Sequence, residues 1–230
     1  MKLFDAHRHL LIDESKPVVA VVNGTSPEDW GPACEAPYAA IGLHPQKIAE
    51  AACDWRERFL EHIGSAQAVG EIGLDGLCGV DMELQLETFR WQLKQSAVNN
   101  MPVSIHCLKA SDLLLRVLKE APPPERGFHL HAYAGSAEQV PLLVKLGGYF
   151  SFHAGQLDGN ARKAPKAIQA VPAARLLIET DAQQDSTKDG EGYEDYLQRG
   201  YILAAQLRRE SLESFRVQVA ENFERYFLDE

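Results

Sequence analysis

Residues 68–107, AVGEIGLDGLCGVDMELQLETFRWQLKQSAVNNMPVSIHC, contain two short apolar runs separated by a segment with helical period. The runs at 68–75 and 102–107 each predict a strand. Between them, apolar residues recur at three- and four-residue steps, as on one face of a helix: Met82, Leu86, Phe89, Leu93 and Ala97. A strand, a helix and a second strand in this order predict two parallel strands of an α/β fold.

The same alternation extends in both directions along the chain. Further strand-like runs precede this stretch at 2–7, 18–24 and 38–44 and follow it at 127–133, 148–154 and 175–182. Eight strands alternating with helices predict a (β/α)8 TIM-type barrel, with residues 1–230 as a single domain. The helix between the second and third predicted strands must be short, because residues 26–37 leave space for only a turn or two. A doubly wound open sheet is the alternative, but it ordinarily has a Gly-rich phosphate-binding turn after its first strand, and this sequence has none there.

The charge of the chain limits how it can bind polyanions. Its 230 residues are 45% hydrophobic and 24% charged, as in a globular protein, and carry a formal net charge of −10. That is the wrong sign for holding nucleic acid by bulk electrostatics, so such a substrate must be bound locally. Bound divalent cations would supply local positive charge.

The cysteines and the N-terminus indicate where the chain works. Four cysteines occur without a Cys-x-x-Cys pair, so neither a disulfide framework nor a thiolate zinc site is predicted. The first ten residues lack the apolar core of a signal peptide, and no apolar run is long enough to cross a bilayer. We therefore expect a cytoplasmic protein with no membrane partner and no obligate protein partner.

Histidines and carboxylates gather at the C-terminal ends of the predicted strands, where a barrel places its active site. His7 and His9 are two residues apart, so on a strand both side chains project to one face and can bind one ion. Imidazole and carboxylate donors favour zinc, manganese, iron or nickel, and several carboxylates also admit magnesium. The sequence predicts a metal site of six residues: His7, His9, Glu71, His106, His131 and Asp181.

Several other polar residues have plainer interpretations. A single histidine in a strand is more often a satisfied core or surface residue than a ligand, and this applies to His44, His129 and His153. His62 is expected to be a solvated helix residue. By contrast, Glu71 and Asp181 lie within apolar strands, where a buried carboxylate is costly unless it is paired or hydrogen bonded.

Two ligand positions remain ambiguous from the residues alone. His129 and His131 face the same way on a strand, and His131 is preferred because it lies nearer the C-terminal end. Asp75 could replace Glu71 as a ligand, although a loop-capping role for Asp75 at the strand exit is equally natural.

Seven pieces of the sequence carry a family resemblance: DAHRHL, GLHP, GEIGLD, PVSIHC, HAYAGS, YFSF and ETDA. Together and in this order they resemble the TatD-like hydrolases of the metal-dependent amidohydrolase and phosphotriesterase superfamily. The resemblance runs over nearly the whole chain. It implies a cytoplasmic enzyme with deoxyribonuclease activity, including 3′ to 5′ exonuclease action, on DNA or a small phosphoester.

The resemblance also implies roles for the six residues. His7, His9 and Asp181 would bind one divalent metal ion, His106 and His131 a second, and Glu71 both. The ions, Mg, Mn, Zn or Ni, would activate a water molecule for attack on the phosphodiester. Asp181 would orient that water and accept its proton, so Asp181 and Glu71 are the expected catalytic residues.

Two departures from the family pattern lie near the expected substrate site. The family usually has arginine two positions after the strand-five histidine, whereas this chain has Leu108 with Lys109 beside it. His153 stands where serine is more usual. Lys109 and His153 are the expected substrate-binding residues. The alternatives are a small-molecule amide, lactone or phosphoester hydrolase on the same metal site, and a non-catalytic metal-binding scaffold.

Overall fold

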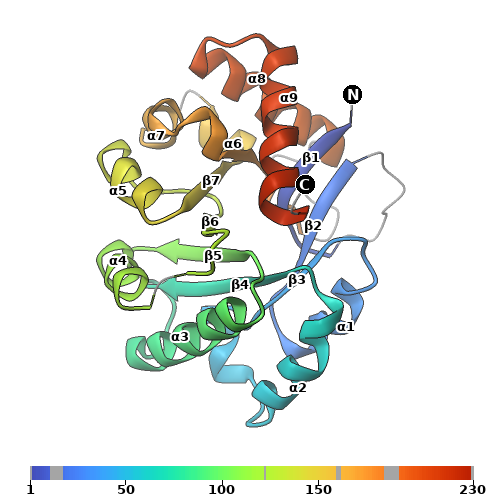
Figure 1. Cartoon of the computed structure of the whole chain (residues 1–230), viewed down its shortest axis with the longest axis vertical. Helices are drawn as coiled ribbons and strands as arrows, with labels where there is room; N and C mark the ends of the chain where they lie inside the picture. Colours follow the sequence, from blue (N-terminus) through green and yellow to red (C-terminus); the bar gives the residue numbers. More distant parts are fainter. Residues whose placement is uncertain (1, 11–17, 122, 159–161, 184–191, 229–230) are drawn as a thin grey trace. The chain divides into compact units, whose positions relative to one another are not determined.

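Eight strands of the computed structural model belong to one sheet, in the order β1-β2-β3-β4-β5-β6-β7-β8 (Figure 1). The structure describes residues 2–10, 18–121, 123–158, 162–183 and 192–228. The strands are β1 (Leu3–Arg8), β2 (Val18–Gly24), β3 (Ala39–Ile41), β4 (Ala68–Asp75), β5 (Val103–Leu108), β6 (Phe128–Leu130), β7 (Gly148–Phe152) and β8 (Leu176–Ile178). Each lies within or closely overlaps a predicted run, and sequential neighbours in a parallel sheet are the arrangement of the predicted fold class.

Helices lie in each connection from β2 to β8 and follow β8. They are α1 (Pro27–Ala33), α2 (Trp55–His62), α3 (Met82–Val98), α4 (Ser111–Glu120), α5 (Val140–Lys145), α6 (Ala154–Leu157), α7 (Ala164–Ala170), α8 (Tyr193–Arg208) and α9 (Leu212–Phe223). Helix α1, with about two turns, confirms the short helix predicted for residues 26–37. None of the helices within the described ranges has both the length and the apolar character that a membrane span needs.

The chain divides into two compact units. Unit 1 comprises Met1–Val21 and His131–Glu230, and unit 2 comprises Val22–Leu130. The assignment of the whole chain to a single domain stays a prediction.

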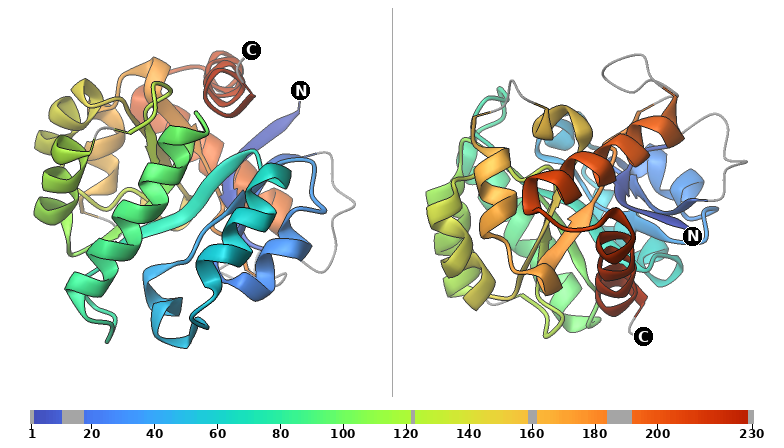
Figure 2. Two further views of the ribbon diagram at one scale, coloured as in Figure 1. Left: turned by 60° about the horizontal axis from the view of Figure 1, so that its bottom comes forward. Right: turned by 90° about the horizontal axis from the view of Figure 1, so that it is seen from above.

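In unit 2, strands β4 and β5 approach each other closely and carry two of the predicted metal ligands, Glu71 and His106. The strands pair in parallel with Gly73 opposite His106. Gly73 has φ +148°, and a Cβ there would lie 2.0 Å from the His106 carbonyl oxygen, so only glycine fits. Helix α3 runs along β4 (Figure 2, left) and buries Phe89 and Leu93 completely or nearly so. It begins at Asp81, whose side chain accepts from two backbone N–H groups of the first turn.

In unit 1 the last helices hold β1 and β8. Helix α9 packs on both strands, with the rings of Phe4 and Phe223 at 5.0 Å (Figure 2, right). Asn222 donates from Nδ2 to the carbonyl oxygens of Ala173 and Leu176 at 2.7 Å each, which fixes the start of β8.

Candidate metal centre

The C-terminal ends of β1 and β8 bring three predicted ligands together in unit 1. Donor atoms of His7, His9 and Asp181 all lie within 4.8 Å of one another, and we call these residues the unit 1 cluster. His9 Nε2 is 3.4 Å from Asp181 Oδ1. Two imidazoles and one carboxylate form a donor set that fits one divalent cation.

Backbone hydrogen bonds between the two strand ends fix this cluster. Asp181 N–H donates to the His7 carbonyl at 3.0 Å, and His9 N–H donates to the Ala182 carbonyl at 2.9 Å. Asp181 has φ +53°, in the left-handed region that aspartate and asparagine tolerate better than most residues. The chain therefore turns at Asp181 and presents its carboxylate beside His9.

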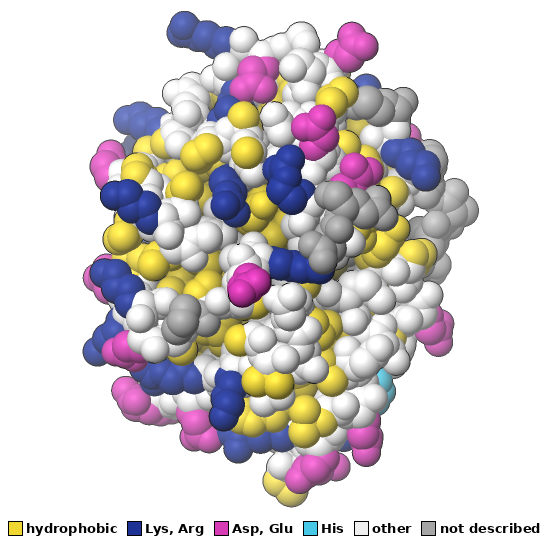
Figure 3. Space-filling view, viewed as in Figure 1, with side chains coloured by type: hydrophobic (Ala, Val, Ile, Leu, Met, Phe, Trp, Pro, Cys, Tyr) yellow, Lys and Arg dark blue, Asp and Glu magenta, His cyan; other side chains and the backbone are white. Residues whose placement is uncertain are grey.

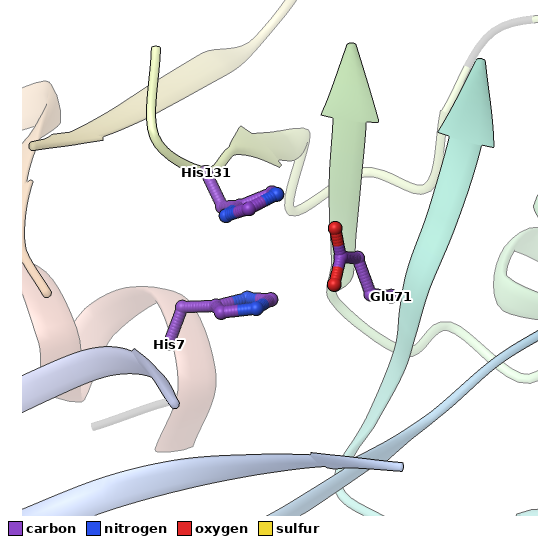
Figure 4. Close-up of side chains that lie close together, drawn as sticks. All are labelled: His7, Glu71 and His131. Atoms are coloured by element: carbon purple, nitrogen blue, oxygen red, sulfur yellow. The ribbon is translucent and has the colours of Figure 1, made fainter. Parts of the chain in front are cut away.

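His131, at the end of β6, lies against the unit 1 cluster. Its ring stacks on that of His7, with centroids 4.1 Å apart and planes at 16° (Figure 4). His129 differs: it is fully buried, and its Nδ1 lies 3.2 Å from Ser104 Oγ in unit 2, as in a core histidine. The structure thus places His131, rather than His129, beside another predicted ligand of its own unit.

A buried glutamate that the sequence analysis missed supports His131. Glu179 Oε1 accepts from Ala132 N–H at 2.7 Å and lies 3.7 Å from His131 Nδ1. Ser151 Oγ donates to Glu179 Oε2. The available signal was its position: Glu179 lies two residues before Asp181 in the apolar run at 175–182, where a buried carboxylate needs a partner. In the structure Glu179 follows β8 and is fully buried. Its carboxylate thus links Ala132 and Ser151 within unit 1.

Asp5 is a second residue that the sequence analysis missed. It is fully buried and lies two residues before His7 in β1. Oδ1 accepts from the N–H groups of His7 and Thr180 at 3.1 and 3.0 Å, and Oδ2 accepts from Thr180 Oγ1 at 2.6 Å and Tyr193 OH at 2.9 Å. Burial raises the pKa of Asp5 to about 6, although the hydrogen bonds from Thr180, Tyr193 and His7 oppose this rise.

We expect Asp5→Ala to lower the free energy of unfolding by about 2–4 kcal/mol. Each buried donor left without an acceptor costs about 1–3 kcal/mol, and removal of the desolvation cost of the buried carboxylate offsets part of that sum. Four donors lose their acceptor. Urea unfolding of the variant measures this, with Asp5→Asn as the control that keeps the volume and one acceptor oxygen. A loss below about 0.5 kcal/mol, as for an ordinary surface substitution, would contradict the structural role of Asp5.

In unit 2, β4 and β5 bring two further predicted ligands together with His44. Glu71 Oε1 lies 2.9 Å from His106 Nδ1 and 3.2 Å from His44 Nε2. Glu71 is 3% exposed. We call His44, Glu71 and His106 the unit 2 cluster, because their donor atoms also lie within 4.8 Å of one another.

Asp75 supports the unit 2 cluster from beside it. Its Oδ2 accepts from Gln46 Nε2 at 2.8 Å and lies 3.7 Å from His106 Nε2, while Oδ1 accepts from Leu77 N–H at 2.8 Å. Burial alone would raise the pKa of Asp75, but the hydrogen bonds from Gln46 and Leu77 outweigh it and lower the pKa. The bond to Leu77 is the loop-capping role weighed for Asp75, and Glu71 makes the closer contact with His106.

The remaining predicted residues lie at the ends of their strands or in a helix. Lys109 follows β5, is exposed and has φ +53°. His153 follows β7, is buried and has Nδ1 2.9 Å from Tyr196 OH. The interpretation of His62 as solvated needs correction: it is half-buried at the end of α2, with Nδ1 2.8 Å from the Arg58 carbonyl and its ring near that of Trp30.

The matching family profile is the one described as TatD related DNase, and it covers residues 4–228. The chain belongs to the TatD family. This confirms the resemblance carried by the seven sequence pieces. Membership also supports the prediction of a metal-dependent hydrolase acting on ester bonds.

Similar proteins agree with this assignment. The chain is 33% identical over 184 residues to the uncharacterized metal-dependent hydrolase YjjV of Escherichia coli, covering 75% of this chain and 70% of YjjV. The crystal structure of YjjV superposes with a TM-score of 0.85 at 26% identity, over 98% of each chain. This likeness confirms the predicted barrel fold of the TatD family.

A second relative is named as a nuclease. The 3′-5′ ssDNA/RNA exonuclease TatD of Escherichia fergusonii is 29% identical over 153 residues, which is 63% of this chain and 57% of the relative. The match thus spans less than two thirds of that enzyme's length.

Proposed function

We propose that this TatD-family chain is a divalent-metal-dependent phosphodiesterase that acts as a deoxyribonuclease of the 3′ to 5′ exonuclease type. The observation that carries the proposal is the unit 1 cluster, in which donor atoms of His7, His9 and Asp181 lie within 4.8 Å of one another. The relative named as an ssDNA/RNA exonuclease supports the choice of substrate.

The proposal assigns two ions. His7, His9 and Asp181 would hold one, His106 and His131 the second, and Glu71 would bind both; the pairing rests on the family resemblance. When bound, such cations lower the pKa of water and stabilise charge on a phosphoryl group. Imidazole and carboxylate donors in both clusters fit Mg, Mn, Zn or Ni.

The chain's own groups then have separate tasks. Asp181 would orient the attacking water and accept its proton at the carboxylate, because it is partly exposed while its backbone is fixed by His7. Lys109 would contact a phosphate from the exposed end of β5. His153, held by Tyr196 at the end of β7, would contact the substrate beside it.

The surface charge explains why such local contacts are needed. The formal net charge is −10, and on the face drawn in Figure 3 basic side chains are interspersed with acidic ones. With this net charge, binding of a polyanion depends on local contacts at the site rather than on the overall charge of the protein.

We expect the purified chain to degrade single-stranded DNA and a bis-nitrophenyl phosphodiester with Mn²⁺ or Mg²⁺. Removal of the metal with EDTA should lower the rate by at least about 100-fold, because bound cations supply the electrostatic stabilisation, and added Mn²⁺ should restore it. Rates before and after chelation measure this. Protein that binds the ions but hydrolyses neither substrate would contradict the proposal.

A small-molecule hydrolase is the second candidate function. It is favoured by the acidic charge and by Leu108 at the position where the family usually has arginine. A panel of amides, lactones and phosphomonoesters separates the two, since this candidate predicts turnover of a compact substrate without activity on DNA. The non-catalytic scaffold predicts normal metal content and no turnover of any activated ester. The cytoplasmic location stays a prediction for each of the three candidate functions.

A further inference from the structure

The two ring nitrogens of His44 have different partners within unit 2. Nδ1 accepts from Gln46 N–H at 3.2 Å, because His44 is the N-cap of the short 3₁₀ helix Pro45–Glu50. Nε2 lies 3.2 Å from Glu71 Oε1. An imidazole nitrogen that accepts a backbone N–H carries no proton, so the proton of neutral His44 lies on Nε2.

From this geometry we propose that His44 is a positioning residue for Glu71. Its Nε2–H donates to Glu71 Oε1 and fixes the orientation of that carboxylate, and His44 does not itself bind an ion. The inference rests on the proposed function, in which Glu71 is a metal ligand. Hydrogen bonds of this kind to a ligating carboxylate orient it and tune metal affinity.

The backbone around His44 is fixed from several sides. The side chain of Gln92 on α3 accepts from Leu43 N–H at 2.7 Å and donates to the Leu43 carbonyl at 3.2 Å. His44 N–H donates to the Thr25 carbonyl at 3.0 Å. Pro45 follows with its restricted φ. The imidazole is therefore held in place before any ion or substrate binds.

Gln46 connects His44 to the rest of the unit 2 cluster. Its backbone N–H binds His44 Nδ1, and its side-chain Nε2 donates to Asp75 Oδ2 at 2.8 Å. Asp75 in turn lies 3.7 Å from His106 Nε2, and the His106 ring meets that of His44 edge to face at 4.6 Å. The carboxylates of Glu71 and Asp75 thus have separate donors, His44 for Glu71 and Gln46 for Asp75.

A metal-ligand role for His44 makes the opposite prediction about its proton. A ligand nitrogen must offer its lone pair, so binding through Nε2 would place the proton on Nδ1. Nδ1–H cannot accept from Gln46 N–H, and the N-cap bond would be lost. The tautomer therefore separates a positioning residue from a ligand.

The first test is the tautomer of His44 in the metal-free chain, read from imidazole ¹⁵N shifts and assigned by the signal lost in His44→Asn. We expect the proton on Nε2, both before and after titration with ZnCl₂. A proton on Nδ1, or a zinc-induced ligand shift at Nε2, would overturn the inference.

The second test uses two variants that each keep one of the two bonds. His44→Asn keeps an N-cap acceptor for Gln46 N–H but cannot reach Glu71, whereas His44→Gln keeps a donor near the position of Nε2 and loses the cap. We expect zinc affinity to fall about 10- to 100-fold in His44→Asn and only a few-fold in His44→Gln. Calorimetric titration measures both, and thermal unfolding shows whether each variant is folded.

The outcomes separate this inference from the proposed function. Wild-type zinc affinity in folded His44→Asn, or equal losses in the two variants, would overturn the inference. Wild-type protein that binds none of zinc, manganese, magnesium and nickel would contradict the proposed function instead, and the tautomer in the metal-free chain would still decide whether His44 donates to Glu71.

Discussion

Asp181→Asn is expected to lower phosphodiester hydrolysis by about 10²- to 10⁴-fold, the range for removal of a positioned general base. The amide has the shape of the carboxylate but cannot accept the proton of water at neutral pH. The substitution also removes the negative charge of the Asp181 carboxylate, whose Oδ1 lies 3.4 Å from His9 Nε2 in the wild type. The rate constant at saturating Mn²⁺ separates lost catalysis from weaker ion binding.

The same variant should keep its fold. Asp181 has φ +53°, and asparagine tolerates this left-handed conformation at least as well as aspartate. Its backbone bond to His7 is independent of the side chain. Asp112→Asn, at an exposed position in the first turn of α4, is a matched control that should keep full activity. Wild-type activity in Asp181→Asn would remove Asp181 from the mechanism.

Glu71→Gln is expected to have the second large effect, a loss of at least about 100-fold in divalent-metal affinity with a matching loss of hydrolysis, since even residues that only support metal ligands cost up to about 100-fold. Glu71 is buried, and two imidazoles contact its Oε1. Glutamine keeps an oxygen there but removes the negative charge that a cation needs. Equilibrium dialysis with metal analysis measures the effect.

A glutamate on the protein surface provides the control for Glu71. Glu87 lies on α3 and forms an exposed ion pair with Arg56 at 2.7 Å. Such surface pairs contribute about 0–1 kcal/mol, so Glu87→Gln should bind metal and hydrolyse substrate like the wild type. If Glu71→Gln retains wild-type metal content as well, Glu71 is not a ligand.

The fold was predictable because its signals are local. Apolar runs marked the strands, and the three- and four-residue steps from Met82 to Ala97 predicted α3 almost to its ends. Gly147 is a further local signal: it follows α5 with φ +96°, a conformation that favours glycine at the end of a helix.

The site was predictable only in part, because its supporting residues depend on partners far along the chain. His7 and His9 share a face by spacing alone, and Asp181 stood out as a carboxylate in an apolar run, although the strand itself ends earlier, at Ile178. Asp5, however, is satisfied by Thr180 and Tyr193, more than 170 residues away. No local pattern distinguishes such a carboxylate from a ligand.

His44 shows the same limit for a single residue. The sequence offered a choice between a core histidine and a surface histidine, and neither describes a ring that joins an N-cap to a buried carboxylate. Which nitrogen carries the proton depends on Gln46 and Glu71 together, and only one of these is a sequence neighbour.

Anomalous diffraction from crystals soaked in MnCl₂ would show directly whether six side chains hold a pair of ions. We predict one peak bound by His7, His9 and Asp181, a second bound by His106 and His131, and Glu71 in contact with both. Crystals in which manganese is absent from these residues, or in which Glu71 and His106 bind no ion, would contradict the proposed chemistry.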